Sequence, residues 1–183
     1  MQRDKNSQPA PAEAGFGRRE LLAAAPLLAA LPQILLAAGQ AAAAPDPTKT
    51  IVVPPKDIPF KPHLNGPPHS VESAELFSKS SQPGIYLNLT KWYPGYMSAP
   101  HWYETDRLCV VVSGTWWVTS GDLFDPNSTI PVTAGSFVHR VARTSHYDGV
   151  KADGTEPAVI AICGMGPITL HPVDPSQPVV RKV

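Results

Sequence analysis

From residue 71 onward the chain alternates short runs of β-branched and aromatic residues with Gly, Pro, Asn and Asp. Such runs predict strands that are bounded by turns. After residue 44 no stretch repeats apolar residues at helical spacing over three turns, so we expect an all-β protein. The expected strands are residues 72–77, 84–92, 99–103, 107–113, 115–119, 130–133, 136–141, 146–150, 157–163 and 168–171.

Turn residues support these breaks: Pro94-Gly95, Ser113-Gly114 and Gly121-Asp122 each stand between two predicted strands. Many short strands in one segment predict a closed barrel or a double-sheet roll. The pattern by itself does not choose between the two.

The first 44 residues have the pattern of an export signal. Arg18 and Arg19 precede an uncharged stretch rich in Ala and Leu over residues 21–38, and small residues follow at 41–44. A paired Arg before such a stretch resembles a twin-arginine signal, which predicts cleavage near Pro45 and a periplasmic location. We therefore expect no stable membrane insertion after cleavage. The alternative is an uncleaved membrane anchor, because about 18 apolar residues are the lower limit for a span.

The predicted organisation is a signal (1–44), a proline-rich arm (45–70), a barrel (71–172) and a C-terminal tail (173–183). Proline lacks a donor, so the arm is expected to be extended, with an edge strand at most. The chain carries 15 basic and 15 acidic residues, and no basic stripe indicates a nucleic-acid partner.

Two stretches resemble the conserved motifs of the cupin superfamily. In residues 92–114, Gly95, His101, Tyr103, Arg107 and Gly114 fall in the register of the first motif, and residues 134–147 resemble the second, with His146 as its ligand. The resemblance covers residues 71–172 and points to small, exported, single-domain bacterial cupins. It implies a jelly-roll (double-stranded β-helix) barrel with its site inside. It also implies a homodimer, because cupins commonly pair through sheet faces.

The cupin motif implies a metal site, and strand geometry explains it. Residues i and i+2 face the same side of a strand, so His101 and Tyr103 point into the barrel, where His146 can meet them. Such ligands suit Fe, Mn, Ni, Cu or Zn. The chain departs from the motif at Tyr103, which replaces a His, and at Arg107, which replaces a carboxylate. Arg cannot ligate a cation, and a phenol ligates only as the phenolate.

Arg107 is the second candidate centre. If it points inward, its charge needs an anionic partner, which is Glu104, Asp106, or a ligand carboxylate or phosphate. Tyr103 and Arg107 are candidate catalytic and ligand-binding residues. Glu104 is a candidate oxygen ligand or general base, although strand alternation turns it away from His101.

Other residues have alternative interpretations. Cys163 has the inward parity of the site and is a candidate ligand-binding residue, a thiolate or redox thiol, half of a disulfide with Cys109, or a small buried hydrophobe. Tyr147 is a candidate ligand-binding residue. With the three tryptophans 102, 116 and 117, it is expected on one rim and the sheet exterior, for stacking or for packing. The histidines 63, 69, 139 and 171 are expected at the surface or at edges.

Two functions remain open from the sequence. The first is a binding protein that takes a small organic ligand into the barrel, with or without a divalent metal. The second is a metal-dependent oxidoreductase of the dioxygenase type, or an isomerase, that acts on a small organic substrate.

Overall fold

The structure is a computed structural model that describes residues 48–183. The chain divides into a unit of residues Met1–Val52 and a compact unit of residues Val53–Val183, which contains the fold. The predicted export signal lies outside the described residues. Within residues 48–183 no helix has the length and apolar character that a bilayer span requires.

The class is all-β, as the alternating pattern predicts. Four strands have the predicted bounds: β3 (Gly84–Trp92), β6 (Arg107–Ser113), β8 (Ile130–Thr133) and β10 (His146–Val150). The other strands are β1 (Lys61–Pro62), β2 (Val71–Phe77), β4 (Tyr96–Ser98), β5 (His101–Trp102), β7 (Thr115–Ser120), β9 (Phe137–Arg140), β11 (Ala158–Gly166), β12 (His171–Pro172) and β13 (Val180–Lys182). Short 3-10 turns, η1 and η2, cover Pro55–Asp57 and Pro126–Ser128.

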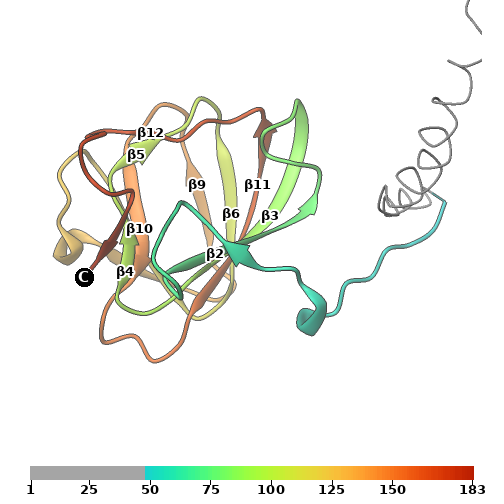
Figure 1. The fold of residues 1–183 in the computed structure, drawn as a ribbon, viewed down its shortest axis with the longest axis horizontal. Helices are drawn as coiled ribbons and strands as arrows, with labels where there is room; N and C mark the ends of the chain where they lie inside the picture. The colour runs from blue at the N-terminus through green and yellow to red at the C-terminus, as the bar shows by residue number, and fades with distance from the viewer. Residues whose placement is uncertain (1–47) are drawn as a thin grey trace, which may run out of the picture. The chain divides into compact units, whose positions relative to one another are not determined.

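The strands form two antiparallel sheets that face each other in a jelly-roll barrel (Figure 1). One sheet has the order β1-β2-β3-β11-β6-β9. The other has the order β12-β5-β10-β4-β13, and β7 pairs with both β10 and β8. The N-terminal arm contributes only β1, at the edge of the first sheet. That place suits its prolines, which cannot donate to a ladder.

Three segments differ most from the prediction. The strand expected over residues 168–171 is observed only as β12, which begins at His171. The strand expected over residues 99–103 is shorter, and β4 precedes it as a separate strand. Residues 173–183, expected to form a tail, contribute β13, which pairs with β4 so that Val180 lies opposite Ser98. Val180 is buried in the core cluster, so apolar burial draws this end of the chain into the sheet.

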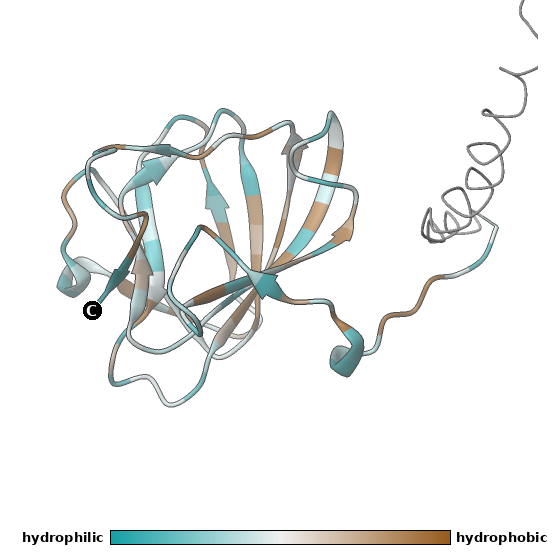
Figure 2. Cartoon of the chain, viewed as in Figure 1, coloured by the Kyte–Doolittle hydropathy of each residue, from teal (hydrophilic) through white to brown (hydrophobic). Residues whose placement is uncertain are grey.

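Burial alternates along β6 and separates an inner face from an outer face, although residues 108–112 of the strand are all apolar (Figure 2). Arg107, Cys109 and Val111 are buried, whereas Leu108 and Val110 are 48% and 44% exposed. Antiparallel partners point to the same side, and Arg107 faces Gly164 on β11. Inward-facing residues of β6 therefore enter the core, and Arg107 enters with them.

The same register separates the two cysteines. Cys109 lies opposite Ile162, whereas Cys163 lies opposite Leu108, so the two thiols point to opposite faces of the sheet. Both are free. The expected inward parity of Cys163 is therefore not observed, because β11 buries Ile160 and Ile162 and alternation turns the next side chain to the outer face.

Candidate functional site

Two buried imidazoles face each other across paired strands. His101 on β5 lies opposite His146 on β10, and their ring centroids are 4.6 Å apart. The Nδ1 of His101 lies 2.8 Å from the Ala99 carbonyl oxygen, and that of His146 lies 2.9 Å from the Thr144 carbonyl oxygen. A carbonyl only accepts, so both Nδ1 atoms carry hydrogen and both Nε2 atoms present lone pairs.

Both imidazoles are neutral at physiological pH. Burial lowers the pKa of His101 to about 4. Burial, with the charge of Arg140 as the next cause, lowers the pKa of His146 to about 2. Both rings therefore present a neutral Nε2 lone pair, and that of His146 accepts a hydrogen bond from a guanidinium.

Arg107 lies against His146 and Tyr103. Its Nη2 donates to His146 Nε2 at 2.7 Å, and its Cζ lies 3.7 Å from the centroid of the Tyr103 ring. The side chain is only 8% exposed, and its Nε atom is buried without a hydrogen-bond partner in the described part of the chain.

Neither expected carboxylate reaches Arg107. Glu104 lies at the rim, where it accepts from the Thr169 backbone N–H and pairs with His171, and these bonds lower the pKa of Glu104 to about 2. Asp106 accepts from the Ala142 backbone N–H and pairs with His139. The predicted protein salt bridge of Arg107 is therefore not observed within residues 48–183.

A second arginine lies beside the first and is paired. Arg140 on β9 faces Arg107 on β6, and its Nη2 bonds Asp148 Oδ2 at 3.1 Å. The other carboxylate oxygen of Asp148 accepts from Trp116 Nε1 at 3.1 Å. With Asp148 fully engaged, this part of the interior holds two guanidiniums and one carboxylate, which leaves one positive charge without a counterion.

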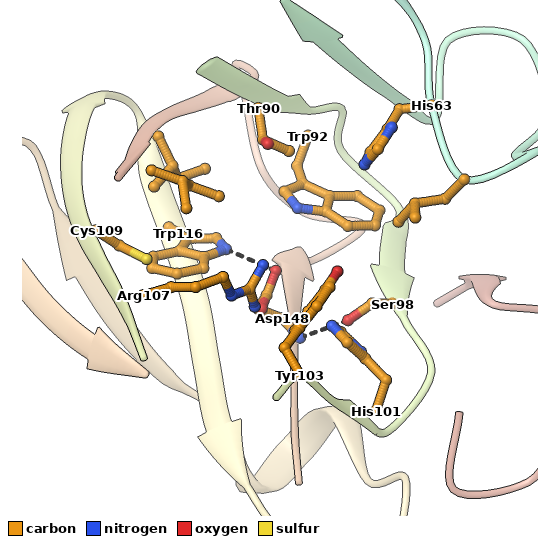
Figure 3. A pocket seen from close by; sticks show the side chains of 13 residues that line it. His63, Thr90, Trp92, Ser98, His101, Tyr103, Arg107, Cys109, Trp116 and Asp148 are labelled. Carbon is orange, nitrogen blue, oxygen red and sulfur yellow. Dashed lines mark hydrogen bonds between the residues drawn. The ribbon is translucent and has the colours of Figure 1, made fainter. Parts of the chain in front are cut away.

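A small cavity of about 30 Å³ lies beside these side chains inside the barrel (Figure 3). Its polar lining comprises His63, Thr90, Ser98, His101, Tyr103, Arg107 and Asp148, and its apolar lining includes Trp92, Trp116, Ile160 and Ile162. An adjoining cavity of about 160 Å³ shares Tyr103 and Arg107 and extends to Tyr86, Asn88, Ile168 and Leu170. Both volumes lie below the range of drug-sized sites, about 300–1,000 Å³, so the space suits only a small ligand.

The structure brings together His101, Tyr103, Arg107 and His146, as the motif register implies. It does not bring in Tyr147, whose hydroxyl is engaged with the backbone of Asp125. Glu104 at the rim and Cys163 on the outer face also lie apart from the cavity. Trp116, expected at the rim or exterior, instead lines the cavity.

Sequence reasoning missed Asp148, Tyr86, Asn88 and His63. The alternation of side chains along a strand could have placed Asp148 in the interior, because it is two residues after His146. It could also have placed the inward residues of β3. No local signal marks His63, because the arm that carries it has no strand periodicity. Burial there lowers the pKa of His63.

Several solved structures are similar to this chain. A polyketide cyclase from Streptomyces resistomycificus is 13% identical, with a TM-score of 0.56 over 71% of this chain and 88% of that one. A protein with a cupin-like fold from Ralstonia eutropha is 18% identical, with a TM-score of 0.53 over 67% and 76%. A cupin-2 domain from Rhodospirillum rubrum is 16% identical, with a TM-score of 0.51 over 72% and 84%. The fold is that of the cupins. No family model matches the chain, and no curated protein matches its sequence.

The residues present do not fit the metal that the cupin fold implies. The described residues contain no cluster of three or more His, Cys, Asp or Glu side chains that could hold an ion. The Nε2 of His146 already accepts from Arg107. Burial raises the pKa of Tyr103, so its phenol stays protonated and is a poor ligand. The guanidinium of Arg107 therefore occupies the lone pair of His146 that a metal ion would need.

Proposed function

We propose that this cupin barrel binds a small organic anion, and that Arg107 supplies the binding charge in place of a metal. The observation that carries the proposal is a buried guanidinium without a carboxylate partner in the described residues. A buried, uncompensated ion costs several kcal/mol after relaxation, so an anionic ligand is its natural counterpart.

The geometry suits a carboxylate. Guanidinium and carboxylate groups form two parallel hydrogen bonds, and the free Nε of Arg107 leaves one edge of the fork unfilled. Tyr103 lies against the same guanidinium and keeps its proton, so it is an available hydrogen-bond donor. Arg140 adds a second positive charge whose partner Asp148 is shared with Trp116.

Matched pairs of carboxylates and amides test this proposal by calorimetry on the full chain. Butyrate and benzoate are expected to bind, whereas butyramide and benzamide, which have nearly the same shape and no charge, are not. Arg107→Met is expected to abolish carboxylate binding. Equal binding of acids and amides, or full binding by Arg107→Met, would refute the proposal.

The alternative function is a metal-dependent oxidoreductase or isomerase in the same barrel. Metal analysis of protein purified from its native periplasm separates the two functions. Near-stoichiometric Fe, Mn, Ni, Cu or Zn, with binding lost on chelation, would favour the enzyme. The double variant Tyr103→His/Arg107→Glu is the positive control, because it supplies the motif's missing ligands and is expected to bind metal.

We further propose a homodimer formed through the outer face of the first sheet. This face carries large side chains that are 44–62% exposed: Ile85, Leu108, Val110, Val112, Phe137 and Met165. Exposed apolar patches mark interaction surfaces, and an apolar patch on one sheet suits a second copy of the same chain.

Light scattering tests the dimer. The wild type is expected to have twice the chain mass, and Val110→Lys is expected to be monomeric. Leu123→Lys is the matched control, because Leu123 is 86% exposed but lies in the loop after β7. A monomeric wild type would contradict the proposal.

We also propose a periplasmic location, reached by the twin-arginine route. The support is the pattern of residues 1–44 alone. Replacement of Arg18 and Arg19 by Lys is expected to keep the full-length precursor in the cytoplasm, and unchanged export of this variant would contradict that route.

A further inference from the structure

Three residues that line the adjoining cavity each have a buried polar atom without a hydrogen-bond partner. The atoms are Tyr86 Oη, Asn88 Oδ1 and Arg107 Nε, each unpaired within the described part of the chain. Buried polar groups without partners are uncommon in folded proteins, since each costs about 1–3 kcal/mol. Their presence in one cavity indicates that a ligand completes them together.

The arrangement of the strands explains how Tyr86 approaches Arg107. Tyr86 on β3, Gly164 on β11 and Arg107 on β6 lie side by side in one inward-facing row. A Cβ at Gly164 would lie 2.7 Å from Tyr86 Oη and 2.9 Å from its Cζ. Glycine therefore leaves the space in which the phenol of Tyr86 lies across β11, on the side of Arg107. Asn88 points inward from the next such row of β3, opposite Ile162.

The three atoms demand different partners. The Oδ1 atom of Asn88 needs a donor, the Nε of Arg107 needs an acceptor, and the hydroxyl of Tyr86 can serve either. A hydroxyl group on the ligand can donate to Asn88 and accept from Tyr86, while a carboxylate meets Arg107. The remaining lining combines apolar side chains, which include Ile162, Ile168 and Leu170, with the polar side chains of His63, Ser80, Thr90 and Tyr103.

An ammonium group would find no anionic partner in this lining. The lining of the adjoining cavity contains no Asp or Glu, and the one carboxylate of the neighbouring cavity, Asp148, is already bonded to Arg140 and Trp116. The uncompensated positive charge of the interior also repels a cation.

We propose that the ligand is a hydroxylated carboxylate, with Arg107 binding the carboxylate and Tyr86 and Asn88 selecting the hydroxyl, and that amino acids are rejected. This inference rests on the proposed anion-binding function, because the carboxylate end is the one that Arg107 holds. Tyr86 is the specificity residue, and Gly164 positions it.

Calorimetry with two probe series tests the selection: butyrate with 3-hydroxybutyrate, 4-hydroxybutyrate and 3-aminobutyrate, and benzoate with 3-hydroxybenzoate and 4-hydroxybenzoate. In at least one series a hydroxylated acid is expected to bind about 10- to 100-fold more tightly than its parent, the factor of one satisfied buried hydrogen-bonding group. The amino acid is expected to bind more weakly than butyrate. Equal affinities of parents and hydroxylated acids, or tight binding of 3-aminobutyrate, would overturn the inference while leaving anion binding intact. Binding of no acid at all would overturn both.

Two variants separate selection from structure. Tyr86→Phe is expected to remove the hydroxyl preference, to keep the affinity for the parent acid, and to leave the ligand-free melting temperature unchanged or raised, because it deletes an unpaired group. Gly164→Ala keeps the phenol but displaces it, so it is expected to have the same binding phenotype.

Tyr147→Phe is the matched control. Its hydroxyl is bonded to the backbone of Asp125 outside the cavity, so this variant is expected to lower the melting temperature and to keep the hydroxyl preference. If Tyr86→Phe kept the preference, or lost stability as Tyr147→Phe does, Tyr86 would have a structural role and the inference would fail.

Discussion

Replacement by Met is expected to change the free energy of unfolding in different ways at the two neighbouring arginines inside this barrel. Arg107 and Arg140 face each other on β6 and β9 and are 8% and 6% exposed, but only Arg140 has a carboxylate partner, Asp148 at 3.1 Å. At that separation and an effective dielectric constant of about 20, the attraction is about 5 kcal/mol. Arg140→Met leaves Asp148 buried and charged, which costs about 3–5 kcal/mol of the free energy of unfolding.

Arg107→Met both loses and gains contributions to the free energy of unfolding. It loses one charged hydrogen bond to His146, worth about 1.5–3 kcal/mol, and a cation–π contact with Tyr103, worth up to about 2 kcal/mol. It gains relief from burying an uncompensated ion, a penalty of several kcal/mol. We therefore expect the free energy of unfolding of ligand-free Arg107→Met to equal that of the wild type or to exceed it by up to about 3 kcal/mol. Binding sites commonly reduce the stability of the ligand-free protein in this way.

Urea denaturation at pH 7.5 without ligand, followed by the fluorescence of the four tryptophans, measures both free energies. The decisive quantity is the difference between the two variants, which we expect to be at least about 3 kcal/mol. If Arg107→Met lost as much stability as Arg140→Met, Arg107 would have a partner within the protein, and the argument for an anionic ligand would fail.

Two further predictions concern the titrating groups. Because His101 and His146 have folded-state pKa values of about 4 and about 2, the unfolded chain, with a reference pKa of about 6.5, binds more protons as the pH falls, so stability is full above pH 6.5 and declines below it. Between pH 7 and pH 5 we expect a loss of about 2 kcal/mol from each histidine, about 4 kcal/mol in all, in urea melts. His101→Gln should halve this slope. The control His69→Asn should leave the slope of stability against pH unchanged, since His69 is exposed and has a positive φ of 56° that Asn tolerates. A wild type whose stability did not depend on pH would contradict the burial of the imidazoles. A thiol assay under denaturing, non-reducing conditions should find two free thiols, and in the native protein Cys163 should react well before Cys109, because burial raises the pKa of Cys109 to about 11; a disulfide between them would show that the β6–β11 register is wrong.

The sequence alone determined the all-β class and the inward direction of the motif residues. Both depend on short-range geometry, because a period of two residues assigns Arg107 and Cys109 to one face of a strand whatever lies around them. The same reasoning predicted the wrong face for Cys163. Which residues of a strand face inward depends on how it pairs with its neighbours, and that register is set between strands and not within one strand.

Only the tertiary structure decided what surrounds Arg107. The sequence offered Glu104 and Asp106 as its partners because they are close in the chain, but the fold directs them to His171 and His139 at the surface. The carboxylate that is near, Asp148, comes from a distant strand and is engaged by Arg140. Which charges pair is decided by strand pairing across the barrel, and that pairing is a long-range property that no local pattern in the chain encodes.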